Sequence, residues 1–411
     1  MKRLLVSALL CVGIAALLPS AVSAQDDITI VSSDAEANFP YSITFEVEAE
    51  AASEIVEIDL EYRVSRDSLI PNDCRVALDF TPARQVAANW TWDMLEVGGL
   101  PTGTEIEYWW LIQDESGNSI ETAPETLGFN DSRYEWHSLA GEGVTFYWYE
   151  GDDEFAQGLV DAAEDALENL ADEFGISLEQ PADFYIYANA WALQGALVYP
   201  DEWTGGVAFP DYSTVVIGIS PNSLAWGNRA IAHELGHLVV HQKVFGPFGV
   251  LPTWLDEGLA MAAEGELRAD LKAVFDQAVA RDAIYSVRSI TGSFPASAGE
   301  AELCYAESYS LVKYLRDNYG SEKILDLLGV FADGETADQA LIQIYGFDMD
   351  GLDRVWRQSL GLDPENPGYP PSPHQGASFV LTAPYIVLFV IVAILGVMTV
   401  YLGYLYARRV R

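Results

Sequence analysis

The segment Ala232-His233-Glu234-Leu235-Gly236-His237-Leu238-Val239-Val240-His241 places three of the chain's five histidines within nine residues. The sequence has helical periodicity from Ala225 onward, and on a helix His233 and His237 lie one turn apart and project from one face. Two neutral imidazole nitrogens at that separation can bind one zinc ion. Glu234 is rotated by about 100° from His233. We therefore expect Glu234 beside the metal, where it can take a proton from bound water.

A zinc site in an enzyme needs a third protein ligand and one position open to water. The extended metzincin pattern requires Gly and His where this chain has Val240 and Lys243. His241 lies two turns from His233, and a helix is too straight for three turns to close on one ion, so we interpret His241 as a polar residue next to the site. Glu257 is the better candidate, because its apolar neighbours favour burial and hence a metal partner. It lies in Leu251-Pro252-Thr253-Trp254-Leu255-Asp256-Glu257-Gly258-Leu259-Ala260, where the proline is suited to starting a second helix.

The spacing between these two segments resembles that of the gluzincin zinc metallopeptidases. Within them, it is most similar to the peptidase MA-like families of bacterial membrane-anchored surface proteins. The resemblance covers about residues 141–362. It implies that His233, His237 and Glu257 ligate one Zn²⁺ ion per chain and that Glu234 is the general base. It also implies a thermolysin-like α+β fold for this domain.

A later segment, Cys304-Tyr305-Ala306-Glu307-Ser308-Tyr309-Ser310-Leu311-Val312-Lys313-Tyr314-Leu315, resembles the helix that carries the catalytic tyrosine of aminopeptidase N-like gluzincins. Tyr305 aligns with that tyrosine, and Tyr309, one turn further on, is the alternative. A phenol hydroxyl near zinc can donate a hydrogen bond to the oxyanion of a tetrahedral intermediate. The carboxylate that the family places four residues after the glutamate ligand has no counterpart, because Met261 occupies that position. Which group orients the histidines therefore stays open.

The segment Gly205-Gly206-Val207-Ala208-Phe209-Pro210 corresponds in position to the Gly-Ala-Met-Glu-Asn strand of aminopeptidase N-like enzymes, with which the substrate backbone pairs. Its glycines let a peptide backbone approach closely. In those enzymes the glutamate of the strand binds the free α-amino group of the substrate. The matching Ala208 has no side chain that can do so, which predicts an endopeptidase. The alternatives are that Gly205-Gly206 is only a loop, or that Asp211 replaces the missing glutamate.

Residues 25–140 are predicted to form an all-β domain. Apolar and polar side chains alternate in Tyr41–Val47 and in Val56–Val64, and a further strand is expected at Glu105–Ile112. Several strands with no helical segment between them favour an antiparallel sandwich resembling immunoglobulin or fibronectin modules.

Residues 141–362 have a different pattern. Strands are expected at Val144–Tyr149, Phe184–Tyr187 and Tyr212–Ile219, and a helix from Phe155 to Phe174. Most of the remaining sequence has helical periodicity. This second domain is therefore expected to be α+β, with a small sheet followed by a helical half.

Both ends of the chain indicate a membrane context. Residues 1–24 have the basic start, apolar stretch and Ala-Val-Ser-Ala end of a secretory signal peptide. Residues 379–402 are apolar, uncharged and long enough for a transmembrane helix. Residues 363–378 are rich in proline and read as a stalk, and the basic tail 403–411 is expected to stay cytoplasmic. We predict a single-pass cell-membrane protein with its N-terminus outside and the lipid bilayer as a partner of its C-terminal helix.

The charge of the chain excludes one class of partner. Five of its 21 basic residues lie outside residues 25–376, so that segment has 16 basic and all 62 acidic residues, with a net charge of −46. Nucleic acid should repel such a polyanion. Cys74 and Cys304 lie far apart in sequence, and whether they pair stays open.

The sequence thus predicts a membrane-anchored, extracytoplasmic zinc metallopeptidase acting on a peptide or protein substrate. It would hydrolyse peptide bonds through a zinc-activated water with Glu234 as general base. The alternative is a non-catalytic surface binding or adhesion protein with a structural zinc site. Glu234 favours the enzyme, because a structural zinc site does not require it.

Overall fold

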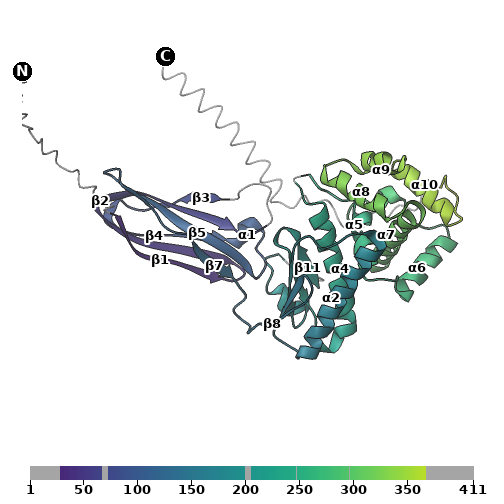
Figure 1. The fold of residues 1–411 in the computed structure, drawn as a ribbon, viewed down its shortest axis with the longest axis horizontal. Coiled ribbons are helices and arrows are strands. Elements are labelled where there is room, and N and C mark those ends of the chain that lie inside the picture. The colour runs from purple at the N-terminus through teal and green to yellow at the C-terminus, as the bar shows by residue number, and fades with distance from the viewer. Residues whose placement is uncertain (1–27, 67–72, 200–204, 247, 296, 367–411) are drawn as a thin grey trace, which may run out of the picture. The chain divides into compact units, whose positions relative to one another are not determined.

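The computed structural model describes residues 28–66, 73–199, 205–246, 248–295 and 297–366 (Figure 1). These residues form two compact units, and the second begins at Ser132 apart from a short segment near residue 66. The expected signal peptide (1–24), transmembrane helix (379–402), cytoplasmic tail (403–411) and all but the first residues of the stalk (363–378) lie outside the described ranges. Within those ranges, no helix has the length and apolar character needed to cross a membrane.

The first unit consists of seven antiparallel strands and the short helix α1 (Met94–Val97). The strands are β1 (Ile28–Asn38), β2 (Ser42–Val64), β3 (Cys74–Ala77), β4 (Ala83–Asp93), β5 (Thr104–Asp114), β6 (Ser119–Glu121) and β7 (Glu125–Phe129). The predicted N-terminal β domain is confirmed. All seven strands are joined in one hydrogen-bonded antiparallel network, in which β2 pairs first with β1 and β4 and then with β3 and β5, and the sandwich itself stays a prediction.

Two details of the predicted alternation in this unit are wrong. The register shifts between Ile55 and Glu57 on β2, so Ile55 is fully buried while Val56 is 45% exposed. A bulge of this kind turns the following side chains to the other face. Tyr41, expected on the buried face, is 51% exposed because it lies in the turn between β1 and β2, where its N–H donates to the carbonyl of Asn38.

The second unit begins with a five-stranded sheet in the order β11-β12-β10-β9-β8. Its strands are β8 (His137–Ala140), β9 (Val144–Trp148), β10 (Ala182–Tyr187), β11 (Gly206–Phe209) and β12 (Thr214–Gly218). The three central strands are parallel, and β8 and β11 are antiparallel edge strands. The boundary expected at residue 140 had placed residues 137–140 in the N-terminal domain. Because β8 pairs with β9, they belong to the sheet of the second unit instead.

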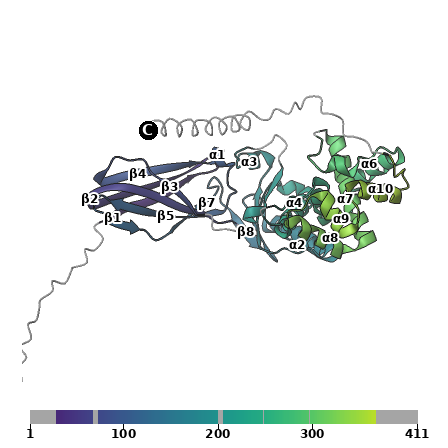
Figure 2. The same cartoon turned by 90° about the horizontal axis from the view of Figure 1, so that it is seen from above.

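Nine helices complete the described part of this unit: α2 (Asp153–Phe174), α3 (Ala190–Gln194), α4 (Leu224–Lys243), α5 (Thr253–Ala263), α6 (Ala269–Ala280), α7 (Ala298–Tyr319), α8 (Ser321–Ala332), α9 (Ala337–Tyr345) and α10 (Met349–Ser359). Short 3-10 turns lie at Pro210–Tyr212, Pro221–Ser223 and Val287–Ile290. Figures 1 and 2 show the sheet at one end of the unit and α6–α10 at the other, with α2 and α4 between them. Asp152 caps the start of α2 and Gly175, with a φ of 68°, ends it, so the helix expected from Phe155 to Phe174 is confirmed.

Two glycines let α5 pack closely between α4 and α7. A Cβ atom added to Gly236 on α4 would lie 2.7 Å from the Cα of Ala260 on α5. One added to Gly258 on α5 would lie 2.5 Å from the carbonyl oxygen of Ser308 on α7. At both points the helix backbones are in direct contact, which brings side chains of three helices to one place.

Neither cysteine of the described residues forms a disulfide. Cys74 is exposed on β3 and Cys304 is buried on α7. The structure therefore shows no bridge between them.

Candidate metal centre

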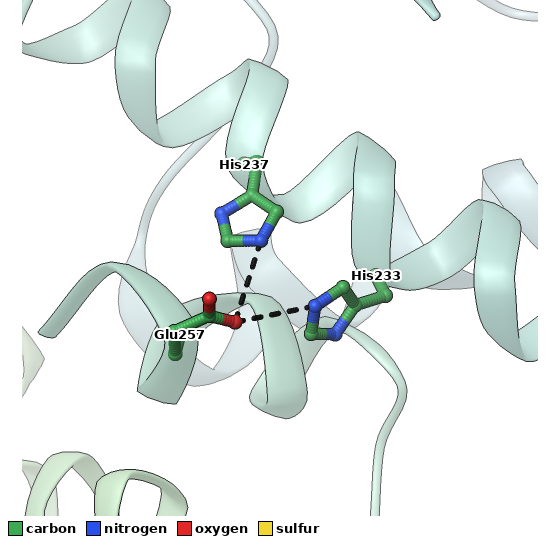
Figure 3. Close-up of side chains that lie close together, drawn as sticks. All are labelled: His233, His237 and Glu257. Carbon is green, nitrogen blue, oxygen red and sulfur yellow. Dashed lines mark ion pairs between the residues drawn. The ribbon is translucent and has the colours of Figure 1, made fainter. Parts of the chain in front are cut away.

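His233 and His237 on α4 point toward Glu257 in the first turns of α5 (Figure 3). The Oε2 atom of Glu257 lies 3.3 Å from Nε2 of His233 and 3.5 Å from Nε2 of His237. One ligand atom from each of the three residues can be chosen so that all lie within 4.8 Å of one another. The helical spacing explains the pair of imidazoles, and the Gly236 contact between α4 and α5 explains the approach of the carboxylate.

These three side chains fit a divalent metal ion. Oε2 of Glu257 is buried and makes no well-formed hydrogen bond to any described residue, although it faces two ring nitrogens. A buried carboxylate oxygen without a hydrogen bond is costly unless a cation neutralises it. Burial alone would raise the pKa of Glu257. The contacts with the two imidazoles outweigh that effect and lower the pKa to about 2. The donor set of two imidazole nitrogens and one carboxylate is that of a catalytic zinc site.

Two further carboxylates orient the histidines. Nδ1 of His233 lies 3.0 Å from Oε1 of Glu264, and Nδ1 of His237 lies 2.9 Å from Oδ1 of Asp256. An ionised carboxylate only accepts hydrogen bonds, so each Nδ1 carries the proton and donates it. The Nε2 atom of each ring then faces Glu257, and the neutral ring would offer its Nε2 lone pair to a metal bound there.

Sequence reasoning missed both of these carboxylates. The position four residues after Glu257, where the family has its carboxylate, is Met261, which is buried and has no polar group. Glu264 lies seven residues after Glu257, just past the end of α5, and so follows on the same helix face by two turns. A search of both one-turn and two-turn spacings could have found it, and Asp256 is the direct neighbour of the ligand.

His241 lies beyond the three candidate ligands. Its Nε2 is 3.1 Å from Oδ2 of Asp256, so the aspartate bridges His237 and His241. His237, His241 and Asp256 also lie close enough to form a metal group. That group would need Nδ1 of His237, which already donates to Asp256, so we place the metal at Glu257 instead.

Glu234 lies between the histidines and the edge strand β11. A Cβ atom added to Gly206 on β11 would lie 3.0 Å from Oε1 of Glu234, so the glycine leaves the room that this carboxylate occupies. Burial raises the pKa of Glu234, and the nearby histidines only partly oppose that effect. Gly205 and Ala208 flank this point, with Ala208 and Val207 paired to Val215 and Val216 of β12. The structure thus places the segment predicted to bind substrate beside the predicted general base.

Tyr305 on α7 lies next to His233, with ring centroids 6.2 Å apart. It lines a pocket of about 290 Å³ together with His233 and Glu234. Burial, and then the charges of Glu257 and Glu234, raise the pKa of its hydroxyl, so the group stays protonated and able to donate. Tyr309 lines a different pocket, with Lys313 at 5.8 Å from its ring, and is not part of the site. A larger pocket of about 680 Å³, beside α2, contains none of these side chains.

The second unit of this chain is similar to a family of known proteins. Residues 162–361 match the family model described as Peptidase MA superfamily. No curated protein matches the chain. Of the solved structures that are similar to this chain, three are described next; their TM-scores are all below 0.5, so none of them supports an argument about fold or function.

An M1 zinc metallopeptidase from Deinococcus radiodurans is 15% identical, with 85% of this chain and 97% of that chain covered and a TM-score of 0.33. OgpA from Akkermansia muciniphila is 8% identical over 26% of this chain and 30% of that chain, with a TM-score of 0.21. This chain thus spans less than a third of OgpA. The bromine derivative of BhCBM56 is 12% identical over 25% of this chain and 94% of that chain, with a TM-score of 0.18.

The family match confirms the resemblance inferred from the two motifs. It covers the helices that carry His233, Glu234, His237, Glu257 and Tyr305. Residues 162–361 therefore match the peptidase MA superfamily, and this match supports a metallopeptidase at the level of that family.

Proposed function

We propose that this chain is a zinc-dependent endopeptidase, anchored in the cell membrane by its C-terminal segment and acting outside the cytoplasm. The observation that carries the proposal is the buried Glu257 carboxylate facing Nε2 of His233 and of His237, with Glu234 and Tyr305 alongside. His233, His237 and Glu257 would hold the zinc. Zinc in such a site polarises the scissile carbonyl and lowers the pKa of a bound water.

The protein's own side chains have separate roles in the hydrolysis. The Glu234 carboxylate accepts a proton from the attacking water and delivers it to the leaving amine. The Tyr305 hydroxyl donates a hydrogen bond to the carbonyl oxygen as negative charge develops on it. Asp256 and Glu264 keep the rings of His237 and His233 in the tautomer that presents Nε2.

The edge strand β11 supports the endopeptidase assignment. Its outer edge has no paired strand among the described residues, and it runs beside Glu234. An extended peptide can add to this edge through backbone hydrogen bonds and reach the site. Ala208 has no group that would hold a free substrate amine, and Asp211, the alternative, lies on the exposed turn that follows β11.

The zinc peptidase proposal is tested by metal analysis and digestion of a peptide library. The wild-type protein should bind one zinc and cleave peptides, and Glu234→Gln should bind zinc but lose at least about a hundredfold in kcat, since general-base catalysis contributes about 10²–10⁴-fold. His233→Ala, His237→Ala and Glu257→Ala should lose the metal, because three ligands cannot spare one.

His241→Ala is the matched control, since it removes a neighbouring imidazole and should retain zinc. If His241→Ala loses zinc while Glu257→Ala keeps it, the third ligand is wrong. If wild type and Glu234→Gln both bind zinc and neither cleaves anything, the chain is a binding protein with a structural zinc site.

The endopeptidase assignment has its own test. A peptide with a free N-terminus and the same peptide acetylated should be cut at the same internal bond with similar kcat/KM. Release of single N-terminal residues from the free peptide alone would identify an aminopeptidase.

A further inference from the structure

The pocket beside His233 is lined by one face of α4. Trp226, Arg229 and Ala230 precede His233 by seven, four and three residues, which places them on the same side of the helix as the histidine. All of them line the pocket of about 290 Å³ that also contains Glu234 and Tyr305. A substrate side chain held in this pocket therefore belongs to a residue next to the bond that is cleaved.

Arg229 is the unusual member of this pocket. It has no hydrogen bond and no ion pair within the described part of the chain, although the segment between residues 25 and 376 contains 62 acidic residues. By contrast, the guanidinium of Arg268, in the same pocket, pairs with Asp270 at 3.1 and 2.8 Å. Among the residues that the structure describes, the pocket thus presents one cation, Arg229, without an ion-pair partner.

The pocket has three acidic groups, Glu234, Glu264 and Glu302, and none of them forms a hydrogen bond or an ion pair with Arg229. Glu264 accepts the hydrogen bond from His233. Glu302 is exposed, and its charge acts on Arg268, whose pKa is raised mainly by Asp270 and also by Glu264 and Glu302. Trp226, which is 44% exposed, adds an aromatic surface against which an aliphatic stem can pack.

We propose that Arg229 binds a substrate carboxylate and makes the enzyme select an acidic group next to the scissile bond. A planar guanidinium matches a carboxylate with two parallel hydrogen bonds, which are stronger than neutral ones. The carboxylate belongs either to an Asp or Glu side chain or to the C-terminal residue of the substrate. This inference rests on the proposed peptidase function for its place in the reaction, but the binding step can be measured without cleavage.

The binding experiment uses the full chain carrying Glu234→Gln, so that peptides stay intact. Fluorescently labelled peptides differ only by Glu or Gln at each position near the cleavage site, all with an amidated C-terminus. A second pair differs only by a C-terminal acid or amide, which separates the two sources of the carboxylate. In one of these pairs, the acidic peptide should bind at least about tenfold more tightly than its neutral partner, a difference that one charged hydrogen bond can supply.

Three variants in the same background identify the residue. Arg229→Gln should abolish the preference for the acidic peptide, and Arg229→Glu should reverse it toward a matched Lys peptide, a gain that a misfolded protein would not show. Arg281→Gln removes the same charge at the exposed end of α6 and should leave the preference intact. Equal binding of every acidic and neutral pair, or a preference that survives Arg229→Gln, would overturn the inference.

Cleavage by the protein without the Glu234 substitution separates this inference from the function on which it rests. Cleavage without any acidic preference overturns only the role of Arg229. Failure to cleave any peptide, with acidic binding still dependent on Arg229, overturns the peptidase function and retains the carboxylate site.

Discussion

At the scale of single residues, Glu264 shows how a side chain outside any motif contributes to the site. It lies past the last turn of α5, only 10% exposed, with Oε1 held 3.0 Å from Nδ1 of His233. This hydrogen bond fixes both the tautomer and the rotation of the ring. Its role is to position a ligand, because its hydrogen bond goes to the His233 ring and none to Glu234 is present among the described residues.

We therefore predict that Glu264→Ala weakens zinc binding by about 10- to 100-fold, the usual effect of removing such a partner. Glu264→Gln keeps an acceptor for the imidazole N–H and should recover most of the affinity. Zinc affinity is measured by competition with a chromophoric chelator. Glu266→Ala, an exposed carboxylate two residues further on, is the control and should bind zinc like the wild type.

Glu307 on α7 is a second buried carboxylate, with a different consequence. Oε1 accepts a hydrogen bond from the backbone N–H of Tyr285 at 3.0 Å, and Oε2 has no hydrogen-bond partner among the described residues. Burial raises the pKa of Glu307 well above its usual range, and the N–H of Tyr285 opposes that effect only in part. The folded protein thus retains a proton on Glu307 that the unfolded chain releases at lower pH.

The sign of the resulting pH dependence follows from linkage. Where the folded state binds more protons than the unfolded state, the free energy of unfolding falls as pH rises. Glu307 should therefore reduce stability progressively from about pH 4.3, the pKa of an unperturbed glutamate, up to its own raised pKa. Glu307→Gln should remove this part of the pH dependence, measured by urea unfolding between pH 5 and 8. The exposed residue Glu322 supplies the control variant, Glu322→Gln, which should keep the wild-type dependence of the unfolding free energy on pH. If Glu307→Gln keeps that dependence too, Glu307 is already ionised in the folded protein.

At the scale of helices, the site depends on how closely α5 approaches α4 and α7. The ligands come from α4 and α5 and the tyrosine from α7, so their relative position depends on the contacts at Gly236 and Gly258. A methyl group at either position meets backbone atoms, which cannot move aside as a flexible side chain can.

Gly236→Ala should therefore destabilise the protein by about 1–3 kcal/mol, the usual cost of overpacking. Zinc affinity should fall with it, because the separation of α4 and α5 moves Glu257 away from the histidines. Gly329→Ala on α8 is the matched control, since a Cβ atom there meets nothing within 4 Å. It should stabilise the helix by up to about 1 kcal/mol. Thermal unfolding and zinc titration of both variants test the pair, and similar behaviour of the two would mean that the α4–α5 contact can relax.

The helices also show what the sequence could and could not predict. One-turn spacing and the distance to Glu257 selected the side chains that the structure brings together, because helix geometry fixes which residues share a face. The role of Glu264 was not predicted, because its hydrogen-bond partner, His233, lies on another helix. That Arg229 has no ion pair among the described residues depends on where side chains of other helices lie in the pocket, which no local sequence pattern records. In the first unit, β2 was predicted as two strands, because the bulge after Ile55 interrupts the alternation without ending the strand.

At the scale of the whole molecule, the proposed topology makes a prediction about intact cells. Protease added outside should cut the proline-rich residues 363–378 and release a soluble fragment that contains both units, because exposed linkers are cleaved before folded domains. Immunoblotting of the medium and of the cell pellet measures the release. Full protection of the protein in intact cells, followed by cleavage after lysis, would contradict the outward orientation.

The outer edge of β11, which pairs with no strand among the described residues, has a consequence for the kind of protein that the proposed peptidase can degrade. A segment that pairs with this edge must be extended and must offer its own backbone N–H and C=O groups, which a folded protein has already engaged in its helices and sheets. Susceptibility of a substrate should then follow the free energy of opening the cleaved segment more than the abundance of suitable residues. The enzyme would act as a sensor of damaged or unstructured chains and would spare stable neighbours on the same surface.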